Sequence, residues 1–204
     1  MVLLSTAYFP PVQFFSKIIN ADKIVLEANE NYIKQSYRNR CYIYGTNGKL
    51  SLNIPVKKGS GLKTPIRDVE IEYVMPWQKV HWKSIESAYQ SSPFFEFYID
   101  DLLPFYQKKY KYLFDYNLEI FHFIIEALEI DIDISLSEKF ITNKNITGSN
   151  FREIIHPKKD YRKYDQEFNP TEYIQVFSVK HGFIPNLSIL DMLLNMGGEA
   201  SLNI

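Results

Sequence analysis

The opening of the chain sets out short apolar segments in a strand–helix–strand order, and this order constrains the fold more than any other feature. Residues 2–9 form an apolar run closed by a proline pair, which favours a strand. Residues 12–21 carry apolar side chains at helical spacing, and residues 23–28 give a second strand. In open α/β sheets ligands gather at the carboxyl ends of strands. The side chains expected at that edge are Ser5, Thr6, Tyr8 and Glu27.

A β-hairpin is the clearest local signal after this opening. Residues 41–56 contain two β-rich runs around Asn47-Gly48, the dipeptide most typical of a tight hairpin turn. A Gly- and Lys-rich connection over 57–65 then leads to a further predicted strand at 66–74. Apolar spacing and turn residues predict the remaining elements: helices over 77–92, 105–128 and 187–198, a strand at 131–138, and a turn or helix cap at 142–150.

These elements predict one α/β domain spanning residues 1–204, with α+β as the alternative class. A small mixed sheet, assembled from the N-terminal half, includes the hairpin near 41–56, and helices dominate the second half. The single cysteine, Cys41, excludes an internal disulfide framework and is typical of a reducing compartment. We find no basic leader and no apolar run of about 18 residues. The sequence therefore predicts a cytoplasmic protein without a membrane span.

Positive charge is concentrated in residues 31–67, which carry eight lysines and arginines and no acidic residue, although the net charge of the chain is −1. If residues 34–42 are extended, Lys34, Arg38 and Arg40 share one face, because their separations are even. Arginine can hold a phosphate or carboxylate through two hydrogen bonds. The pattern favours a site for a small anionic substrate, and a solvated edge strand is the alternative structural interpretation.

Two acid–base candidates and one buried polar pair complete the predicted site. His81 and Glu27 are the candidate catalytic residues, since a histidine with a near-neutral pKa suits proton transfer. Asp191 and Asn195 lie one helical turn apart among apolar residues, so the carboxylate needs a donor, and Arg38 or Arg40 is a candidate. A buried ion pair of Asp191 that locks the terminal helix explains these two residues equally well.

No motif in the sequence specifies a cofactor, a metal site or an oligomeric state. The histidines lack metal-ligand spacing, and the usual phosphate-binding glycine loops do not occur. Nucleic acid is an alternative partner, because tyrosines interleave with the basic residues of 31–67. The isoelectric point of about 6.4 argues against it. The rival to an enzyme is thus a non-catalytic protein that docks a partner or nucleic acid through residues 31–67.

An ordered set of short strings along nearly the whole chain resembles the WbqC-like protein family, whose members are encoded among others in bacterial O-antigen gene clusters. The matching strings are Tyr8-Phe9-Pro10, Phe14-Phe15, Lys17-Ile18, Ala21-Asp22, Asn31-Tyr32-Ile33-Lys34, Arg38-Asn39-Arg40, Ile54-Pro55-Val56, His81-Trp82, Ser84-Ile85, Tyr89, Leu187-Ser188-Ile189-Leu190-Asp191, Asn195 and Gly197. The resemblance implies a transferase that passes an aminoacyl, acyl or related group in the biosynthesis of a surface polysaccharide.

The first strand departs from the pattern of that family. The family's strand ends in His-Gln-Pro-Asn-Tyr-Leu-Pro-Trp, and alignment on Tyr8 places four other residues at the first four positions and Pro11 at the position of the tryptophan. The four residues are Leu4, Ser5, Thr6 and Ala7. If the histidine carries a proton in relatives, this protein either lacks that step or performs it with another residue.

Overall fold

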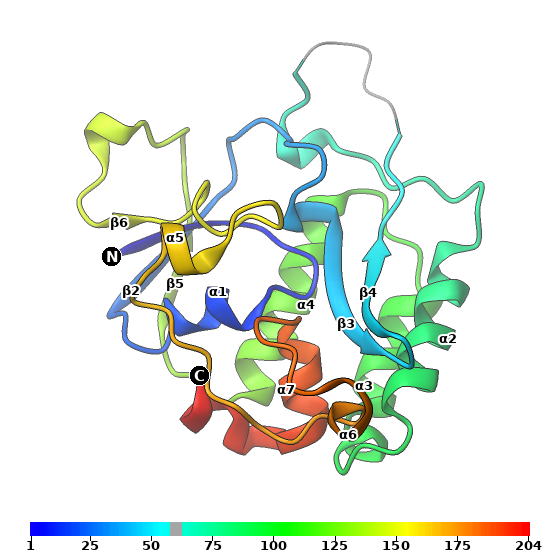
Figure 1. Ribbon diagram of the computed structural model, residues 1–204. Helices are drawn as coiled ribbons and strands as arrows, with labels where there is room; N and C mark the ends of the chain where they lie inside the picture. The colour runs from blue at the N-terminus through cyan, green and yellow to red at the C-terminus, as the bar shows by residue number, and fades with distance from the viewer. Residues whose placement is uncertain (58–62) are drawn as a thin grey trace.

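The computed structural model describes residues 1–57 and 63–204, and it has a mixed α/β architecture (Figure 1). Its strands are β1 (Val2–Ser5), β2 (Lys23–Glu27), β3 (Arg40–Gly45), β4 (Gly48–Asn53), β5 (Asp133–Leu136) and β6 (Ser149–Asn150). Its α-helices are α1 (Val12–Ser16), α2 (Trp77–Tyr89), α3 (Phe95–Gln107), α4 (Leu113–Ala127), α5 (Tyr161–Tyr164), α6 (Ser178–His181) and α7 (Ile189–Met196). Short 3₁₀ helices span Tyr37–Asn39, Ile66–Asp68, Asn143–Asn145 and Gly197–Asn203.

The α/β class predicted from the sequence is confirmed. Four parallel strands form a sheet in the order β5-β2-β1-β6. The predicted hairpin is present as β3 and β4, paired around Gly45 and Gly48, and it forms a separate two-stranded sheet. The second half of the chain supplies β5 and β6, which flank the two strands predicted from the opening of the chain.

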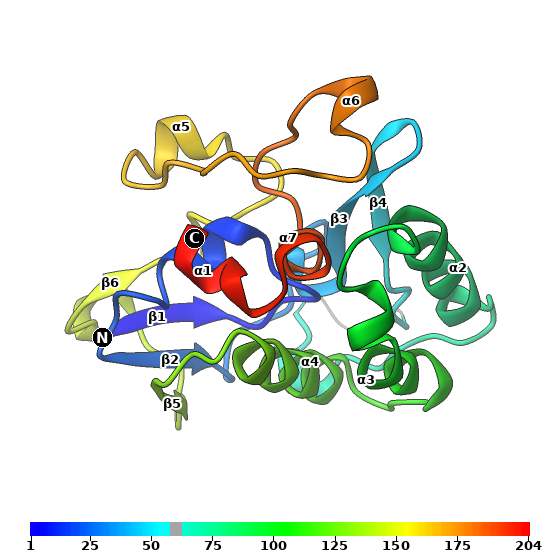
Figure 2. The ribbon, with the colours of Figure 1, turned by 90° about the horizontal axis from the view of Figure 1, so that it is seen from below.

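One hydrophobic cluster joins the sheet, the hairpin and the longer helices. It contains Leu4 and Ile24 of the parallel strands, Ile43 of the hairpin, and Phe121 of the apolar stripe predicted for the long helix. In Figure 2, β1 and β2 run toward α2, α3 and α4, whereas α1 and α7 lie above β1. The carboxyl ends of the two strands therefore point into the interior of the molecule, where side chains that follow them become buried.

Two predicted elements are wrong, and a single long-range contact explains both. The segment 66–74 is a 3₁₀ turn followed by isolated bridges, not a strand, and the helix predicted over 105–128 is two helices separated near Lys111. The backbone of Ile71 donates to the carbonyl of Lys111 at 2.9 Å, and Leu113 donates to Val69 at 2.9 Å. This pairing holds the residues before Leu113 extended and so interrupts the helical pattern.

Two further sequence predictions concern the end of the last helix and the turn over 142–150. The glycine pair ends α7, with Gly197 in the left-handed region at φ 63°, as expected for a helix C-terminus. The stretch predicted as a turn or cap over 142–150 contains a 3₁₀ turn and also the short strand β6. Residues 58–62, within the predicted Gly- and Lys-rich connection, lie outside the described residues.

Candidate functional site

The order of the parallel strands creates a topological switch point between β1 and β6. From β1 the chain adds β2 and then β5 on one side, and it later returns to add β6 on the other side. Ligands of open α/β sheets bind outside the carboxyl ends of strands at such a point. Here the residues that follow β1 are Thr6 and Ala7, and those that follow β6 are Phe151 and Arg152.

A small cavity lies at this switch point, and we call it the switch-point cavity. Its volume is about 10 Å³, close to the minimum for one water molecule. Its walls are formed by Leu4, Ser5, Thr6, Ala7, Phe14, Tyr37, Arg38, Phe151, Arg152 and Ile155. Thr6 is 3% exposed, and its hydroxyl oxygen has no hydrogen-bond partner among the described residues. A buried hydroxyl without a partner is costly, so this atom marks the cavity as unusual.

Arg38 reaches the switch-point cavity with most of its charge already paired. Its Nε donates to Oε1 of Glu30 at 2.8 Å and its Nη2 to Oε2 at 2.5 Å, and the same Nη2 donates to the Ser5 hydroxyl at 2.7 Å. Ser5 in turn donates to Oε2 of Glu30 at 3.1 Å. Among the described residues, Nη1 of Arg38 makes no hydrogen bond, so one end of the guanidinium retains its donors.

A second buried arginine, Arg152, lies on the other side of the switch point. Its Nη1 donates to Oε2 of Glu27 at 2.7 Å, and its Nη2 donates to the carbonyl of Ile141 at 2.7 Å. Both oxygens of Glu27 are saturated: Oε1 accepts from Asn29 N and Ser137 Oγ, and Oε2 accepts from Ile141 N and Arg152. Sequence reasoning identified Glu27 but not Arg152 or Glu30, which lie outside the basic segment and the motifs considered.

The prediction that Lys34, Arg38 and Arg40 share one extended face is wrong. Residues 37–39 form a 3₁₀ turn, and Gln35 adopts a positive φ of 58°, so the even spacing does not translate into a shared face. Arg38 turns inward, Lys34 is exposed, and Arg40 binds the side chain of Asn53 at 2.6 Å. Only Arg38 of the three lines the switch-point cavity.

Tyr8 and His81, both predicted site residues, are in direct contact. The Tyr8 hydroxyl lies 3.0 Å from Nδ1 of His81 and 2.9 Å from the hydroxyl of Tyr106. Burial lowers the pKa of His81 from 6.5 to about 4, although a hydrogen bond with the backbone of Asn53 raises it in part. At neutral pH the imidazole is therefore neutral, and its Nδ1 can accept a hydrogen bond from the Tyr8 hydroxyl.

The surroundings of His81 hold two further unsatisfied polar atoms. Trp77 and His81 lie with ring centroids 5.1 Å apart, and Trp77 and Tyr116 5.8 Å apart. The Trp77 Nε1 and the Tyr116 hydroxyl are buried with no hydrogen-bond partner in the described parts of the chain. Phe9, next to Tyr8, has a positive φ of 38°, a strained conformation for a non-glycine residue. Strain and unpaired polar atoms of this kind concentrate at functional sites.

Asp191 is buried, but its donors are not the predicted arginines. Arg38 pairs with Glu30, whereas the Asp191 carboxylate accepts from Tyr89 at 2.8 Å, from Tyr173 at 2.5 Å and from Gln175 at 2.8 Å. Burial raises the pKa of Asp191, and these three hydrogen bonds counteract the rise. Asn195 donates only to the backbone carbonyl of Asp191. The pair therefore lies in the packing of α7, apart from the switch-point cavity.

Several larger pockets lie away from the predicted site residues. One, of about 470 Å³, lies between α3 and α4, and another, of about 520 Å³, lies between the hairpin turn and α2. Neither includes Thr6, Arg38 or His81 in its walls. The larger volumes thus lie elsewhere, whereas the unpaired Thr6 hydroxyl, the two buried arginines and the sheet topology all indicate the switch point.

Comparison with known proteins assigns the chain to a family. The WbqC-like protein family matches residues 6–156, which include β2, the hairpin, α2 and the arginines of the switch point. The chain therefore belongs to the WbqC-like protein family. It is also 24% identical to the uncharacterized protein Rv1507c of Mycobacterium tuberculosis, over 98% of this chain and 95% of that protein. No solved structure gives a significant match.

The helices of the described residues do not include one with the length and apolar character needed to cross a membrane.

Proposed function

We propose that this protein is a group-transfer enzyme that binds a small anionic substrate at the switch-point cavity. The observation that carries this proposal is the Thr6 hydroxyl, which is buried without a partner in a wall shared with Arg38 and Arg152. A hydroxyl and two guanidinium groups are the donors that a carboxylate or phosphate accepts from. The resemblance to the family supplies the pathway: transfer of an aminoacyl, acyl or related group in the biosynthesis of a bacterial surface polysaccharide.

The departure from the family pattern supports this location. Leu4, Ser5, Thr6 and Ala7 are the four residues that replace His-Gln-Pro-Asn, and all four line the switch-point cavity. The variable part of the motif therefore coincides with the cavity wall, whereas Tyr8, the next residue, keeps the family pattern and contacts His81. Leu4 cannot carry a proton, so this protein either lacks that step or performs it with another residue, and the neighbouring Tyr8–His81 pair is our candidate.

The roles follow from the contacts. Arg38 and Arg152 hold the anion, and Glu30 and Glu27 fix the orientation of the two guanidinium groups. His81 is our candidate proton acceptor, because its imidazole is unprotonated at pH 7, although the lowered pKa also makes it a weaker base than a free imidazole. The cavity holds only about one water molecule, so part of its wall must move outward when substrate enters.

A binding screen tests this proposal against the rival function. Nucleotides, nucleotide sugars and acyl-CoA thioesters are added separately in a thermal-shift assay, and oligonucleotide binding is measured at increasing salt. We expect a rise in melting temperature with at least one small anion, since a ligand that binds only the folded state stabilises it. Salt-sensitive oligonucleotide binding without any small-molecule response would instead favour a docking protein and overturn the proposal.

A further inference from the structure

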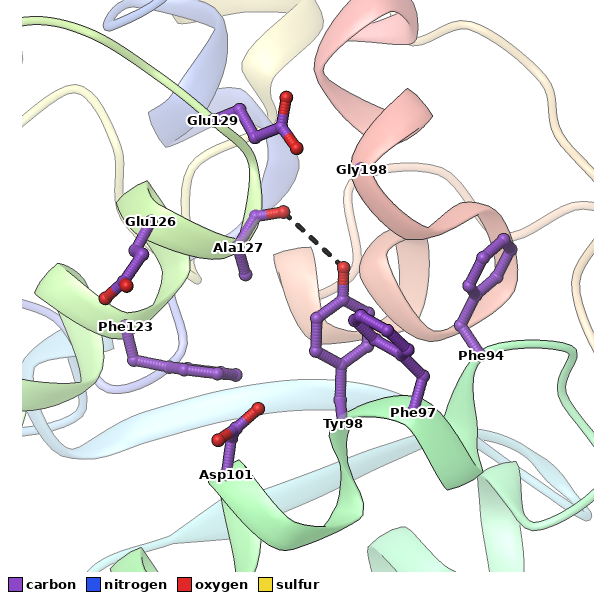
Figure 3. Close-up of a pocket in the computed structure, with 9 residues that line it drawn as sticks. All are labelled: Phe94, Phe97, Tyr98, Asp101, Phe123, Glu126, Ala127, Glu129 and Gly198. Carbon is purple, nitrogen blue, oxygen red and sulfur yellow. Dashed lines mark hydrogen bonds between the residues drawn. The ribbon is translucent and has the colours of Figure 1, made fainter.

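A ligand-sized pocket between α3 and α4 is lined by aromatic rings and carboxylates, and we call it the α3–α4 pocket. Its volume is about 470 Å³, within the range of small-molecule sites. Figure 3 shows α3 contributing Phe97, Tyr98 and Asp101, and α4 contributing Phe123 and Glu126. It shares no wall residue with the switch-point cavity. The α3–α4 pocket is thus separate from the anion site proposed above.

Three aromatic rings, those of Phe97, Tyr98 and Phe123, form one corner of the α3–α4 pocket. The ring centroids of Phe97 and Tyr98 are 4.8 Å apart with the planes at 85°, and those of Tyr98 and Phe123 are 6.4 Å apart at 82°. Phe97 is 73% exposed, so its ring is accessible to a ligand from solvent. These rings pack edge to face and line the same pocket, and an aromatic face that is open to a ligand attracts an alkylammonium group.

The charged groups of the α3–α4 pocket all have the same sign. Asp101, Glu126 and Glu129 line it, and the described wall residues include no lysine or arginine. Burial and the negative charges of Glu129 and Asp101 together raise the pKa of Tyr98, which places these two carboxylates close to its ring. The pocket therefore combines an apolar wall with a negative potential, and a neutral or anionic ligand would leave that potential uncompensated.

The carboxylates are not arranged for a metal ion. In the parts of the chain that the structure describes, no group of three His, Cys, Asp or Glu side chains converges as a metal site requires. A divalent cation needs several oxygens at short distance, whereas an organic cation needs rings in contact and charges at longer range. The geometry of the α3–α4 pocket meets the second requirement and not the first.

We infer that the α3–α4 pocket binds a small molecule through an alkylammonium group. The group enters the corner formed by Phe97, Tyr98 and Phe123, and the carboxylates of Asp101 and Glu126 compensate its charge. The Tyr98 hydroxyl, which donates to the carbonyl of Ala127, holds the central ring in place (Figure 3). This site is independent of the anion site, so each is tested separately.

The test compares two ligands that share a shape and differ in charge. Choline and its uncharged isostere 3,3-dimethylbutan-1-ol are titrated into the full chain by calorimetry, with sodium chloride balancing ionic strength. We expect choline to bind with a millimolar or tighter dissociation constant and the alcohol at least about fivefold more weakly. Equal binding of both, or no binding at about 10 mM choline, overturns the inference.

Variants locate the binding to this pocket. Phe97→Ala removes one wall of the corner, and Asp101→Asn removes one charge; each should weaken choline binding by about 2- to 5-fold. Asp100→Asn is the matched control, because it removes the same charge from the adjacent exposed position of α3 outside the pocket. Choline affinity should survive Asp100→Asn and Thr6→Val. If Asp100→Asn and Asp101→Asn weaken binding equally, the attraction is non-specific and the assignment of the site is wrong.

Discussion

Replacing Thr6 by valine tests whether the Thr6 hydroxyl serves to bind a substrate or to stabilise the fold. The Thr6 hydroxyl is buried and unpaired among the described residues, so the native protein bears the cost of its lost hydration. Valine has nearly the same shape without that polar atom. We expect Thr6→Val to raise the unfolding free energy by about 1 kcal/mol, the lower end of the penalty for an unsatisfied group. For a chain of this size that corresponds to about 2–4 °C in melting temperature.

The same substitution should weaken anion binding. If the hydroxyl donates to the substrate, its loss removes a hydrogen bond to a charged group, which contributes about 1.5–3 kcal/mol and weakens binding by about 10- to 100-fold. The assay titrates the strongest ligand of the anion screen, with inorganic phosphate as the minimal anion. Unfolding in urea, followed by circular dichroism, gives the stability of the same samples.

Thr6→Ser is the matched control, because it keeps the hydroxyl and removes the methyl group. It should lose about 0.8 kcal/mol of stability through reduced apolar burial and keep most of the affinity. The two variants thus change stability in opposite directions, and only Thr6→Val loses most of the affinity. A loss of more than about 1 kcal/mol in Thr6→Val would refute the reasoning, since the hydroxyl must then have a stabilising partner. Unchanged ligand affinity in Thr6→Val would exclude the switch-point cavity as the anion site.

Three further predictions concern buried ionisable groups. The His81 pKa is lowered from 6.5 to about 4, so unfolding takes up a proton between these values, and stability should fall by about 3 kcal/mol as the pH drops through this window. His81→Gln should abolish that part of the pH dependence in urea unfolding; an unchanged profile would exclude the assignment. The Asp191 pKa is raised above 3.8, so its contribution to stability falls as the pH rises from 3.8 through the folded-state pKa, and Asp191→Asn should remove this decline in the same assay. Arg38→Met leaves the carboxylate of Glu30 buried alone and should cost about 3–5 kcal/mol, whereas Arg38→Met with Glu30→Gln should cost markedly less. Additive losses in the double variant would show that the pair is not coupled.

The parallel pair at the start of the chain was predictable because its signals are local. Apolar runs of strand length, a proline pair and a short helical segment define β1 and β2, and the carboxyl ends of both follow directly. The register places Ser5 opposite Glu27, so two of the predicted edge residues are neighbours. The hairpin was predictable for the same reason, since Asn47-Gly48 specifies the turn within four residues.

The segment 66–74 shows where local signals fail. Its apolar alternation is that of a strand, but a strand needs a neighbour over its whole length. In the fold it meets Pro55 on one side and Lys111 to Leu113 on the other, each through one or two hydrogen bonds. The sequence contains no indication of these partners, because they are about 15 and 40 positions away along the chain. The same contact splits the helical pattern that surrounds Lys111.

The chemistry of the candidate site depends on distant partners in the same way. An arginine in a basic segment looks like an exposed anion receptor, and for Lys34 and Arg40 the side chains do remain at or near the surface. Arg38 differs only because the turn at Gln35 and the 3₁₀ helix after it redirect the side chain toward Glu30. Burial and pairing then change what the Arg38 side chain can do. Its guanidinium has little attraction for distant anions, but its free donors are held at one fixed place. The high local charge of residues 31–67 therefore does not reveal how each cation is used, because Arg38 is buried against Glu30 whereas Lys34 is exposed.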